Sequence, residues 1–309
     1  MDKIISVDIV VSCYNVENII EKCLNSLLSQ SYPKDKYHCY FVNDYSSDKT
    51  GDILDKYSEH QNITILHHEQ NKGLSATRNT GATIGDAELV AFLDGDMTVK
   101  NDWIESFLPY FGKHVIGVMG DNIAPSGIIL NPMEKYYFGA KRGARQFGDG
   151  DHLSFQYMLY GNAMIKRSVL SEVGFFDENI IQYGGEDTDL SAKIWDKYKG
   201  GFVFSKNSNS IHFHRRNMNE FCLSMKTYGK HNLPILINRY PQYEKELGGD
   251  WVYSLKGYML FNPLIKMIIK SILLIKPLQI FIRYIVINSV ISGARKSKKW
   301  MKLNKKIYT

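Results

Sequence analysis

The chain has 309 residues, of which 44% are hydrophobic and 23% are charged, and its formal net charge is +6. This composition excludes a disordered or collagen-like chain and suits one large α/β domain with an appendage. The charge is unevenly distributed, because twelve Lys or Arg and no acidic residue follow Asp250, while residues 1–250 carry a net charge of −6. This shift predicts a boundary near residue 250, with a main domain at 1–250 and a basic tail at 251–309.

Strands and helices alternate over the first hundred residues. Buried-strand patterns are followed by helical stripes of apolar residues, and this order predicts a mostly parallel sheet with right-handed crossovers. In such sheets ligands bind beyond the carboxyl ends of the strands. The predicted strands are residues 6–12, 38–43, 63–67 and 88–93, and the predicted helices are residues 16–30, a segment around Ile53 and Leu54 capped by Asp48, and residues 74–83.

The pattern is less regular after residue 98. We expect helices at 103–111, 168–173 and 190–198 and strands at 115–119, 162–165, 202–205 and 210–213. Residues 121–160 combine glycines, aromatic residues and basic residues with weak periodicity. This stretch therefore yields no residue-level prediction.

Two acidic clusters lie at the ends of apolar segments. Asp94-Gly95-Asp96 directly follows the strand pattern 88–93, and Glu186-Asp187-Thr188-Asp189 precedes the helical pattern 190–198. Carboxylates beside a core strand are costly unless a cation or hydrogen-bond donor compensates them. The first pair suits a hard divalent cation, Mg²⁺ or Mn²⁺, and the second cluster suits proton transfer. Together they predict metal-assisted chemistry on a phosphate-bearing donor.

Six motifs in order resemble the inverting family 2 glycosyltransferases, which have the GT-A fold. The resemblance covers roughly residues 5–230. Two departures are Tyr45, where the family has a small residue, and Lys193, where it has arginine. The six motifs are Val10 to Asn15, Val42 to Asp48, Asn71 to Asn79, Phe92 to Asp96, Gly174 to Glu178 and Gly185 to Leu190.

The resemblance implies a nucleotide-sugar-binding half at 1–98 and an acceptor-binding half at 99–230. Asp187 would be the catalytic base, and Gly185, Glu186 and Asp189 would bind the acceptor. Asp96 would ligate the metal, and one of two histidines would complete its shell, His212 by preference and His214 as the alternate. The residues expected at the donor are Ser12, Tyr14, Asn15, Asp44, Lys72, Gly73, Arg78, Asp94 and Gly95.

The tail contains two apolar runs, residues 260–275 and 278–292, divided by Pro277. Each is shorter than the roughly 20 residues that a spanning helix needs. We therefore expect peripheral or re-entrant attachment to the cytoplasmic side of a membrane, supported by the basic residues from Arg295 to Lys306. The alternative is a helical pair packed on the main domain with a disordered basic end. Nucleic-acid binding is not expected, because the main domain is acidic.

The predicted function is transfer of a sugar from a nucleotide-diphosphate donor to a hydroxyl of a saccharide or lipid-linked acceptor, in cell-surface glycan synthesis. Two alternatives stay open. One is a nucleotide-sugar-binding module without catalysis. The other is a nucleotidyltransferase, which would need a glycine- and lysine-rich phosphate loop where this chain has Ser12-Cys13-Tyr14-Asn15-Val16.

Overall fold

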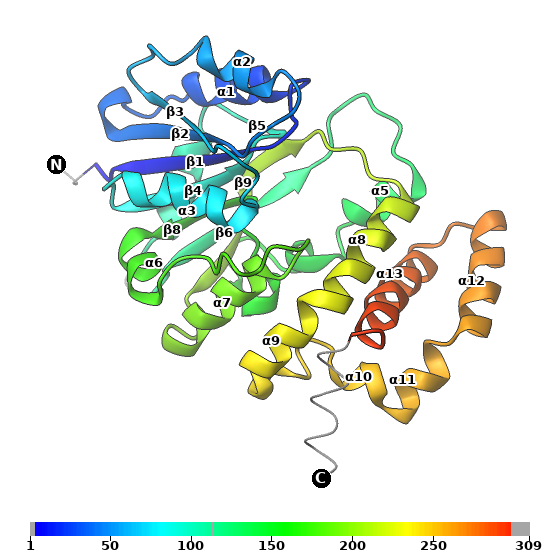
Figure 1. Cartoon of the computed structure of the whole chain (residues 1–309). Coiled ribbons are helices and arrows are strands. Elements are labelled where there is room, and N and C mark those ends of the chain that lie inside the picture. The colour runs from blue at the N-terminus through cyan, green and yellow to red at the C-terminus, as the bar shows by residue number, and fades with distance from the viewer. Residues whose placement is uncertain (1–3, 113, 298–309) are drawn as a thin grey trace. The chain divides into compact units, whose positions relative to one another are not determined.

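The computed structural model describes residues 4–112 and 114–297. Within these ranges the chain forms two compact units. The first unit comprises the residues up to 128 together with 143–181 and 186–214. The second comprises 129–142, 182–185 and the residues from 215 onward, and Figure 1 labels the elements of both.

The first unit is built on a nine-stranded sheet of order β3-β2-β1-β4-β8-β6-β9-β5, with β7 paired to β9. Strands β1, β2, β3 and β4 are parallel to one another, and β8 is antiparallel to β4. The predicted alternation of strands and helices is therefore confirmed. The strands are β1 Val7–Cys13, β2 Tyr37–Asn43, β3 Ile63–His67, β4 Leu89–Asp94, β5 Met97–Val99, β6 Gly117–Ile123, β7 His152–Leu153, β8 Asn162–Lys166 and β9 Phe202–His212.

Helices cover this sheet and form one large hydrophobic core with β1. In α1 the residues Ile20, Cys23, Leu24 and Leu27 are all buried, which matches the predicted stripe. The helices of this unit are α1 Ile20–Leu28, α2 Thr50–Asp55, α3 Leu74–Ile84, α4 Trp103–Phe107, α6 Arg167–Val173 and α7 Glu186–Lys197.

Helix α1 begins later than the predicted residue 16 because loop contacts hold the preceding backbone. The N–H of Val16 donates to Thr50 Oγ1 at 2.9 Å, and the N–H of Glu17 donates to Asp48 Oδ2 at 3.0 Å. Asp48 also accepts from the N–H of Thr50, the first residue of α2, but the N-cap of this helix is Lys49 and not Asp48 as predicted. These side chains connect the loops after β1 and β2.

Three local predictions are corrected. The strands expected at 202–205 and 210–213 are one strand, β9, whose register against β6 shifts between Gly120 and Asn122. The three residues of β5 were not predicted, since so short a strand shows no periodicity. Helix α7 begins at Glu186 rather than at 190, because carboxylates in a first turn are favoured by the helix dipole.

The second unit is helical. It begins well before the predicted boundary near residue 250, because α8, which precedes that boundary in the chain, packs against α13, which follows it. A Cβ added at Gly229 of α8 would lie 2.0 Å from the carbonyl oxygen of Val290 in α13, so the two helices approach as closely as only glycine permits. Its helices are α5 Pro132–Tyr137, α8 Met218–His231, α9 Leu233–Arg239, α10 Asp250–Tyr253, α11 Leu255–Leu260, α12 Pro263–Ile275 and α13 Gln279–Ala294.

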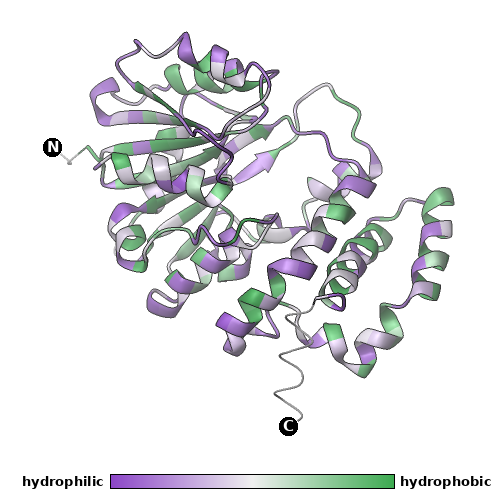
Figure 2. Ribbon diagram, in the orientation of Figure 1, coloured by the Kyte–Doolittle hydropathy of each residue, from purple (hydrophilic) through white to green (hydrophobic). Residues whose placement is uncertain are grey.

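Helices α12 and α13 correspond to the two predicted apolar runs but differ in burial. Half of α13 is buried, including Ile282, Ile285 and Ile291, whereas no residue of α12 is buried. Figure 2 shows polar residues interspersed in this helical appendage, which is therefore not uniformly apolar. Among the described residues, no helix has both the length and the hydrophobicity needed to cross a bilayer.

Candidate active site

The carboxyl ends of β1, β2 and β4 bring the predicted donor loops together. Ser12 lies opposite Asp94 in the parallel pairing of β1 with β4, and the N–H of Asp44 donates to the carbonyl of Cys13 at 2.9 Å. Gly95 lies against the same backbone, where its N–H donates to the carbonyl of Ser12 and an added Cβ would meet that oxygen at 2.8 Å. Three of the predicted donor loops thus share one edge of the sheet.

Asp44 organises the loop that follows β3. Its buried carboxylate accepts hydrogen bonds from the backbone N–H of Lys72 at 2.8 Å and of Gly73 at 2.9 Å. The ring Nδ1 of His68 lies 2.7 Å from the same carboxylate. Gly73 has φ of +87°, a conformation that favours glycine. Asp44 therefore fixes the start of α3, and its direct contact with a nucleotide stays a prediction.

Some side chains in the loops at this edge of the sheet are exposed to solvent. Tyr14 is 52% exposed, and Lys72 is also exposed. Asn15 is engaged in the loop, since its Oδ1 accepts from the N–H of Ser47 at 2.8 Å. The hydroxyl of Ser12, by contrast, is buried and has no hydrogen-bond partner within the described part of the chain. Ser12, Tyr14 and Lys72 are thus placed where a donor could bind.

Arg78 joins the two acidic clusters. Its Nη2 donates to Asp94 Oδ1 at 3.1 Å, and its Nη1 donates to Asp187 Oδ1 at 2.7 Å. The side chain is only 2% exposed, and its guanidinium lies 5.2 Å from the centre of the Phe176 ring. The predicted convergence of the aspartates is therefore present. Both Nη atoms of Arg78 contact these carboxylates, and the direct donor contact predicted for Arg78 stays a prediction.

The opposite charges of Arg78 and its carboxylates favour one another's charged forms, whereas their burial away from water opposes these forms. Burial by itself lowers the pKa of Arg78, but the carboxylates of Asp187, Asp94 and Glu186 outweigh burial and raise that pKa. Burial raises the pKa of Asp187, while Arg78 lowers it and Asp94 raises it, and the net direction is upward. Burial and the charge of Asp187 raise the pKa of Glu186 to about 7. Two carboxylates of raised pKa thus lie beside one buried cation.

Asp189 does not face an acceptor. Its side chain is fully buried and lies 3.1 Å from Lys193 Nζ, one turn further along α7. The predicted acceptor contact is therefore wrong for the structure as it stands, because the helix turns this residue into the protein interior. Lys193, at the position where the family has arginine, supplies the compensating charge.

Gly185 belongs to the second unit together with Gln182, Tyr183 and Gly184. It is buried and has φ of +102°, and an added Cβ would lie 3.2 Å from the Cβ of Asn232. Asn232 Nδ2 donates to the carbonyls of Gln182 at 2.8 Å and Gly184 at 2.6 Å. Asn232 thus holds the glycine turn that precedes α7, and the acceptor role of Gly185 stays a prediction.

Both predicted histidines approach Asp96. His212 Nε2 lies 3.1 Å from Asp96 Oδ2, and His214 Nδ1 lies 3.9 Å from the same oxygen. The expectation that only one of them faces this carboxylate is wrong, since residues two apart in an extended segment point to the same side. Pairing of β5 with β9 sets Met97 opposite His212, which places the acidic loop beside the histidines.

The side chains of Asp96, His212 and His214 contain atoms of the kinds that bind a divalent cation, but these atoms do not surround a common point. One carboxylate oxygen and two imidazole nitrogens lie near one another. Across residues 4–112 and 114–297, however, no group of three or more His, Cys, Asp or Glu is arranged to hold a metal ion. The side chains would have to shift to surround one.

Comparison with known proteins settles the family. The family model described as glycosyl transferase family 2 matches residues 8–174, more than half of the chain. The chain belongs to glycosyl transferase family 2. This confirms the predicted family, and with it the class of enzyme that the motifs indicate.

Relatives and solved structures agree with this assignment. Glycosyltransferase AglE of Haloferax volcanii is 27% identical over 58% of this chain and 58% of its own length. The glucosyl-dolichyl phosphate glucuronosyltransferase of the same organism is 24% identical over 67% of this chain and 68% of its own. This family 2 chain spans between 38% and 58% of the length of the first curated relatives that it matches.

The fold is that of known GT-A glycosyltransferases. The mannosyltransferase PcManGT from Pyrobaculum calidifontis, solved with GDP-Man and Mn²⁺, superposes with a TM-score of 0.65 at 15% identity. The superposition covers 97% of this chain and 89% of that one. The predicted GT-A fold is therefore confirmed for this family 2 member.

Sequence reasoning missed His68 and the structural role of Arg78. His68 follows the predicted strand 63–67 directly, at the edge where ligands bind, so its position was a usable signal. Its Nε2 also lies 3.0 Å from Thr80 Oγ1 in α3. The bridging role of Arg78 had no comparable signal, because its partner Asp187 is 109 residues away.

A double-mutant cycle tests the Arg78 bridge in this family 2 enzyme. Arg78→Gln should lower the free energy of unfolding by about 3 kcal/mol, because it leaves the largely buried carboxylate of Asp187 and the partly exposed one of Asp94 without their cation. In an Asp94→Asn/Asp187→Asn background the same change should cost much less. Urea unfolding followed by circular dichroism measures both.

Arg167 provides the matched control, since it pairs with Asp8 near the start of β1. Arg167→Gln should cost the same in the wild-type and the Asp94→Asn/Asp187→Asn background. Equal losses for Arg78→Gln in the two backgrounds would contradict the bridge.

Proposed function

We propose that the protein transfers a sugar from a nucleotide-diphosphate donor to a hydroxyl group, with inversion at the anomeric carbon. The observation that carries this proposal is the buried Arg78, which holds Asp94 and Asp187 in one site. Asp94 belongs to the loop beside the predicted donor residues, and Asp187 begins α7. A donor group and a base are thus within reach of one another, as a single displacement requires.

The donor class is supported by the likeness to the mannosyltransferase solved with GDP-Man and Mn²⁺. In this chain the buried hydroxyl of Ser12 and the exposed ring of Tyr14 lie at and just after the carboxyl end of β1, and the exposed Lys72 follows β3 in the loop whose backbone Asp44 holds. A hydroxyl and a cation suit a ribose and a diphosphate. Asp44 serves this site by positioning the Lys72-Gly73 backbone.

Asp96, His212 and His214 would hold the cation. A carboxylate suits both Mg²⁺ and Mn²⁺, whereas imidazole nitrogen is a donor that Mg²⁺ rarely takes, so the set favours Mn²⁺. When bound, the cation supplies positive charge to the departing diphosphate. Asp94, restrained by Arg78, is then available to orient the donor.

Asp187 would act as the general base. Its carboxylate takes the proton of the acceptor hydroxyl as that oxygen bonds to the anomeric carbon. The bond from that carbon to the phosphate oxygen breaks, and the nucleoside diphosphate leaves with the electron pair. Arg78 fixes the orientation of Asp187 through Oδ1, and burial raises the pKa of Asp187, which makes it a stronger base. Arg78 is a positioning residue in this scheme.

The acceptor is a saccharide or a lipid-linked glycan, as in cell-surface glycan synthesis. A relative that acts on a glucosyl-dolichyl phosphate, by its name, supports the lipid-linked class. Glu186, whose pKa is raised to about 7 by burial and by Asp187, can exchange hydrogen bonds with acceptor hydroxyls next to the base.

Asp187→Asn should abolish transfer and leave donor binding nearly unchanged, because the amide keeps the shape of the carboxylate but cannot accept the proton. We expect a loss of about 10²–10⁴-fold in kcat, from the usual contribution of a general base. Turnover measured with a panel of nucleotide sugars, and donor affinity by calorimetry, separate the two effects.

Asp196→Asn, an exposed change on the same helix, should retain wild-type turnover. An Asp187→Asn enzyme of undiminished kcat would refute the base assignment. A wild-type protein that binds a donor but neither transfers nor hydrolyses it would identify a binding module instead of an enzyme.

Mn²⁺ binding should depend on the Asp96 cluster. Electron paramagnetic resonance of Mn²⁺ in the presence of a nucleoside diphosphate should show one bound ion per chain. Asp96→Asn and His212→Gln should each weaken binding by about tenfold or more. EDTA should stop transfer, and Mn²⁺ should restore it. His60→Gln, at an exposed histidine, is the control, and equal Mn²⁺ affinity in all variants would remove the cluster from metal binding.

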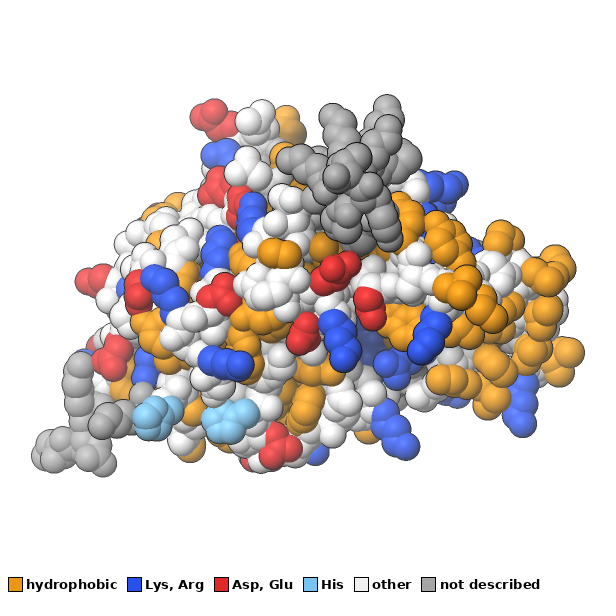
Figure 3. Space-filling view, turned by 90° about the horizontal axis from the view of Figure 1, so that it is seen from below, with side chains coloured by type: hydrophobic (Ala, Val, Ile, Leu, Met, Phe, Trp, Pro, Cys, Tyr) orange, Lys and Arg blue, Asp and Glu red, His pale blue; other side chains and the backbone are white. Residues whose placement is uncertain are grey.

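We further propose peripheral attachment to the cytoplasmic side of a membrane through residues 255–309. Support comes from the exposed apolar side chains of α11 and α12, among them Leu255 at 76%, Leu274 at 89% and Ile275 at 89%. Figure 3 shows hydrophobic side chains gathered at the right edge, over α11 and α12, with basic side chains among them. Apolar area next to lysines suits an anionic bilayer surface.

Leu274→Glu/Ile275→Glu should release the protein from vesicles of phosphatidylglycerol and phosphatidylcholine, as measured by sedimentation. The paired control Ile129→Glu/Leu223→Glu introduces the same charge at exposed apolar residues outside α11 and α12 and should leave sedimentation unchanged. Unchanged sedimentation of the first variant would refute attachment through α12. Deletion of 255–309 is a less specific test, because it also removes α13, on which α8 packs.

A further inference from the structure

The second unit contains a pocket that the transfer reaction does not use. Its volume is about 820 Å³, within the roughly 300–1,000 Å³ typical of small-molecule sites. The walls come from α12 and α13, from the start of α8 and from α5. Met133, Met218, Leu273 and Leu274 supply much of an apolar lining, and methionine adapts readily to flexible apolar ligands.

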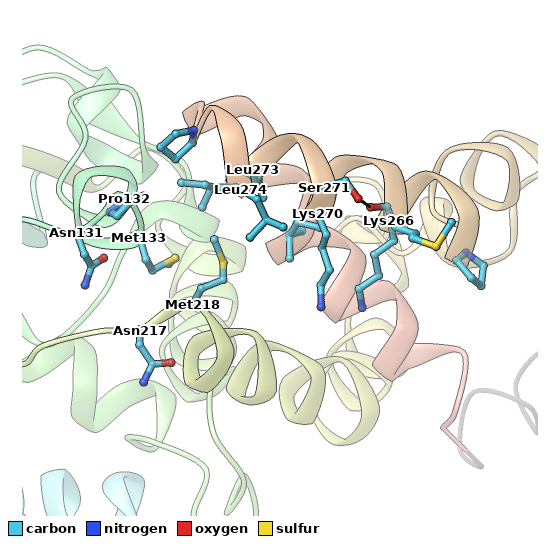
Figure 4. A pocket seen from close by; sticks show the side chains of 15 residues that line it. Asn131, Pro132, Met133, Asn217, Met218, Lys266, Lys270, Ser271, Leu273 and Leu274 are labelled. Atoms are coloured by element: carbon cyan, nitrogen blue, oxygen red, sulfur yellow. Dashed lines mark hydrogen bonds between the residues drawn. The ribbon is translucent and has the colours of Figure 1, made fainter.

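Two lysines of α12 give the pocket a cationic end. Figure 4 shows Lys266 and Lys270 side by side with their ammonium groups pointing the same way, while Met133, Met218, Leu273 and Leu274 lie to one side of them. None of the described residues that line this pocket is acidic. The two ammonium groups therefore belong to a wall that contains no carboxylate.

The electrostatics of Lys266 point to an anionic ligand. Burial lowers the pKa of Lys266, and the positive charges of Lys270 and of Lys226 on α8 lower it further. Crowded, partly desolvated cations are stabilised when an anion binds between them. Phosphate is well matched to two ammonium groups.

We propose that this pocket binds one lipid molecule whose phosphate headgroup has a net negative charge, with its hydrocarbon chain among the methionine and leucine side chains and its phosphate on Lys266 and Lys270. A purely apolar ligand would leave the lysines uncompensated, and a free phosphate would leave the apolar walls exposed. An amphiphilic ligand would both compensate the lysines and cover the apolar walls.

This proposal goes beyond membrane attachment, because a helix can lie on a bilayer without holding any single lipid. It is also independent of sugar transfer. A test with monomeric lipid therefore separates failure of the pocket from failure of vesicle attachment or of catalysis.

The test is isothermal titration calorimetry of the full chain with myristoyl lysophosphatidylglycerol, below its micelle concentration, against myristoyl lysophosphatidylcholine. We expect saturation at one lipid per chain and preference for the anionic lipid. Lys266→Gln/Lys270→Gln should weaken lysophosphatidylglycerol binding by about thirtyfold, from the usual contribution of two lysines near an anionic headgroup. It should change lysophosphatidylcholine binding little.

Met218→Trp should weaken both lipids by about tenfold or more, because the indole fills the pocket. If this variant loses the circular dichroism spectrum of the wild type, Ser271→Trp replaces it, at an exposed residue of α12 that also lines the pocket. Lys256→Gln/Lys276→Gln removes the same charge at lysines outside the pocket and should bind like the wild type. Absence of saturable binding, equal affinity for both lipids, or full binding by the tryptophan variant would overturn the proposal.

Discussion

One buried guanidinium organises the catalytic half of this molecule. Arg78 is almost completely removed from solvent, and such a cation is tolerated only where carboxylates compensate it. The two that do so, Asp94 and Asp187, come from the end of β4 and the first turn of α7. Because both carboxylates lie at hydrogen-bonding distance from the guanidinium, the predicted donor loop and the segment that contains the proposed base, Asp187, are held in one place. Asp44 separately fixes the backbone just before α3, the helix that contains Arg78.

This arrangement links stability and function. A charged network buried at the edge of a sheet adds little net stability, since desolvation offsets much of the Coulombic attraction. Its benefit is geometric, because Arg78 restrains the carboxylate of Asp187 through Oδ1 and that of Asp94 through Oδ1 as well. Burial raises the pKa of Asp187, which would strengthen it in the proposed role of base, while the paired arginine favours the ionised form. A base preorganised in this way would need little rearrangement during reaction.

Much of the fold and part of the site could be predicted from the sequence. Continuous apolar runs and stripes of period 3.6 located β1 to β4 and their helices, and the order of six motifs identified the family. What could not be predicted depends on contacts between distant residues. No pattern connects Arg78 to Asp187, nothing local turns Asp189 inward, and β5 is too short to show a period although it places Asp96 beside His212. The tail was predicted as two apolar runs divided by Pro277, but the sequence did not show that they differ in burial: half of α13 is buried, whereas no residue of α12 is.

The central claim is that Arg78 holds the donor-side and acceptor-side carboxylates together during donor binding. The most direct measurement is a crystal structure of the full chain with a nucleotide-diphosphate sugar and Mn²⁺. The account predicts Nη atoms of Arg78 within hydrogen-bonding distance of both Asp94 and Asp187, Mn²⁺ on Asp96, and Asp187 facing the anomeric carbon. A structure in which Arg78 leaves either carboxylate to contact the nucleotide, or in which Asp187 points away from the sugar, would contradict it.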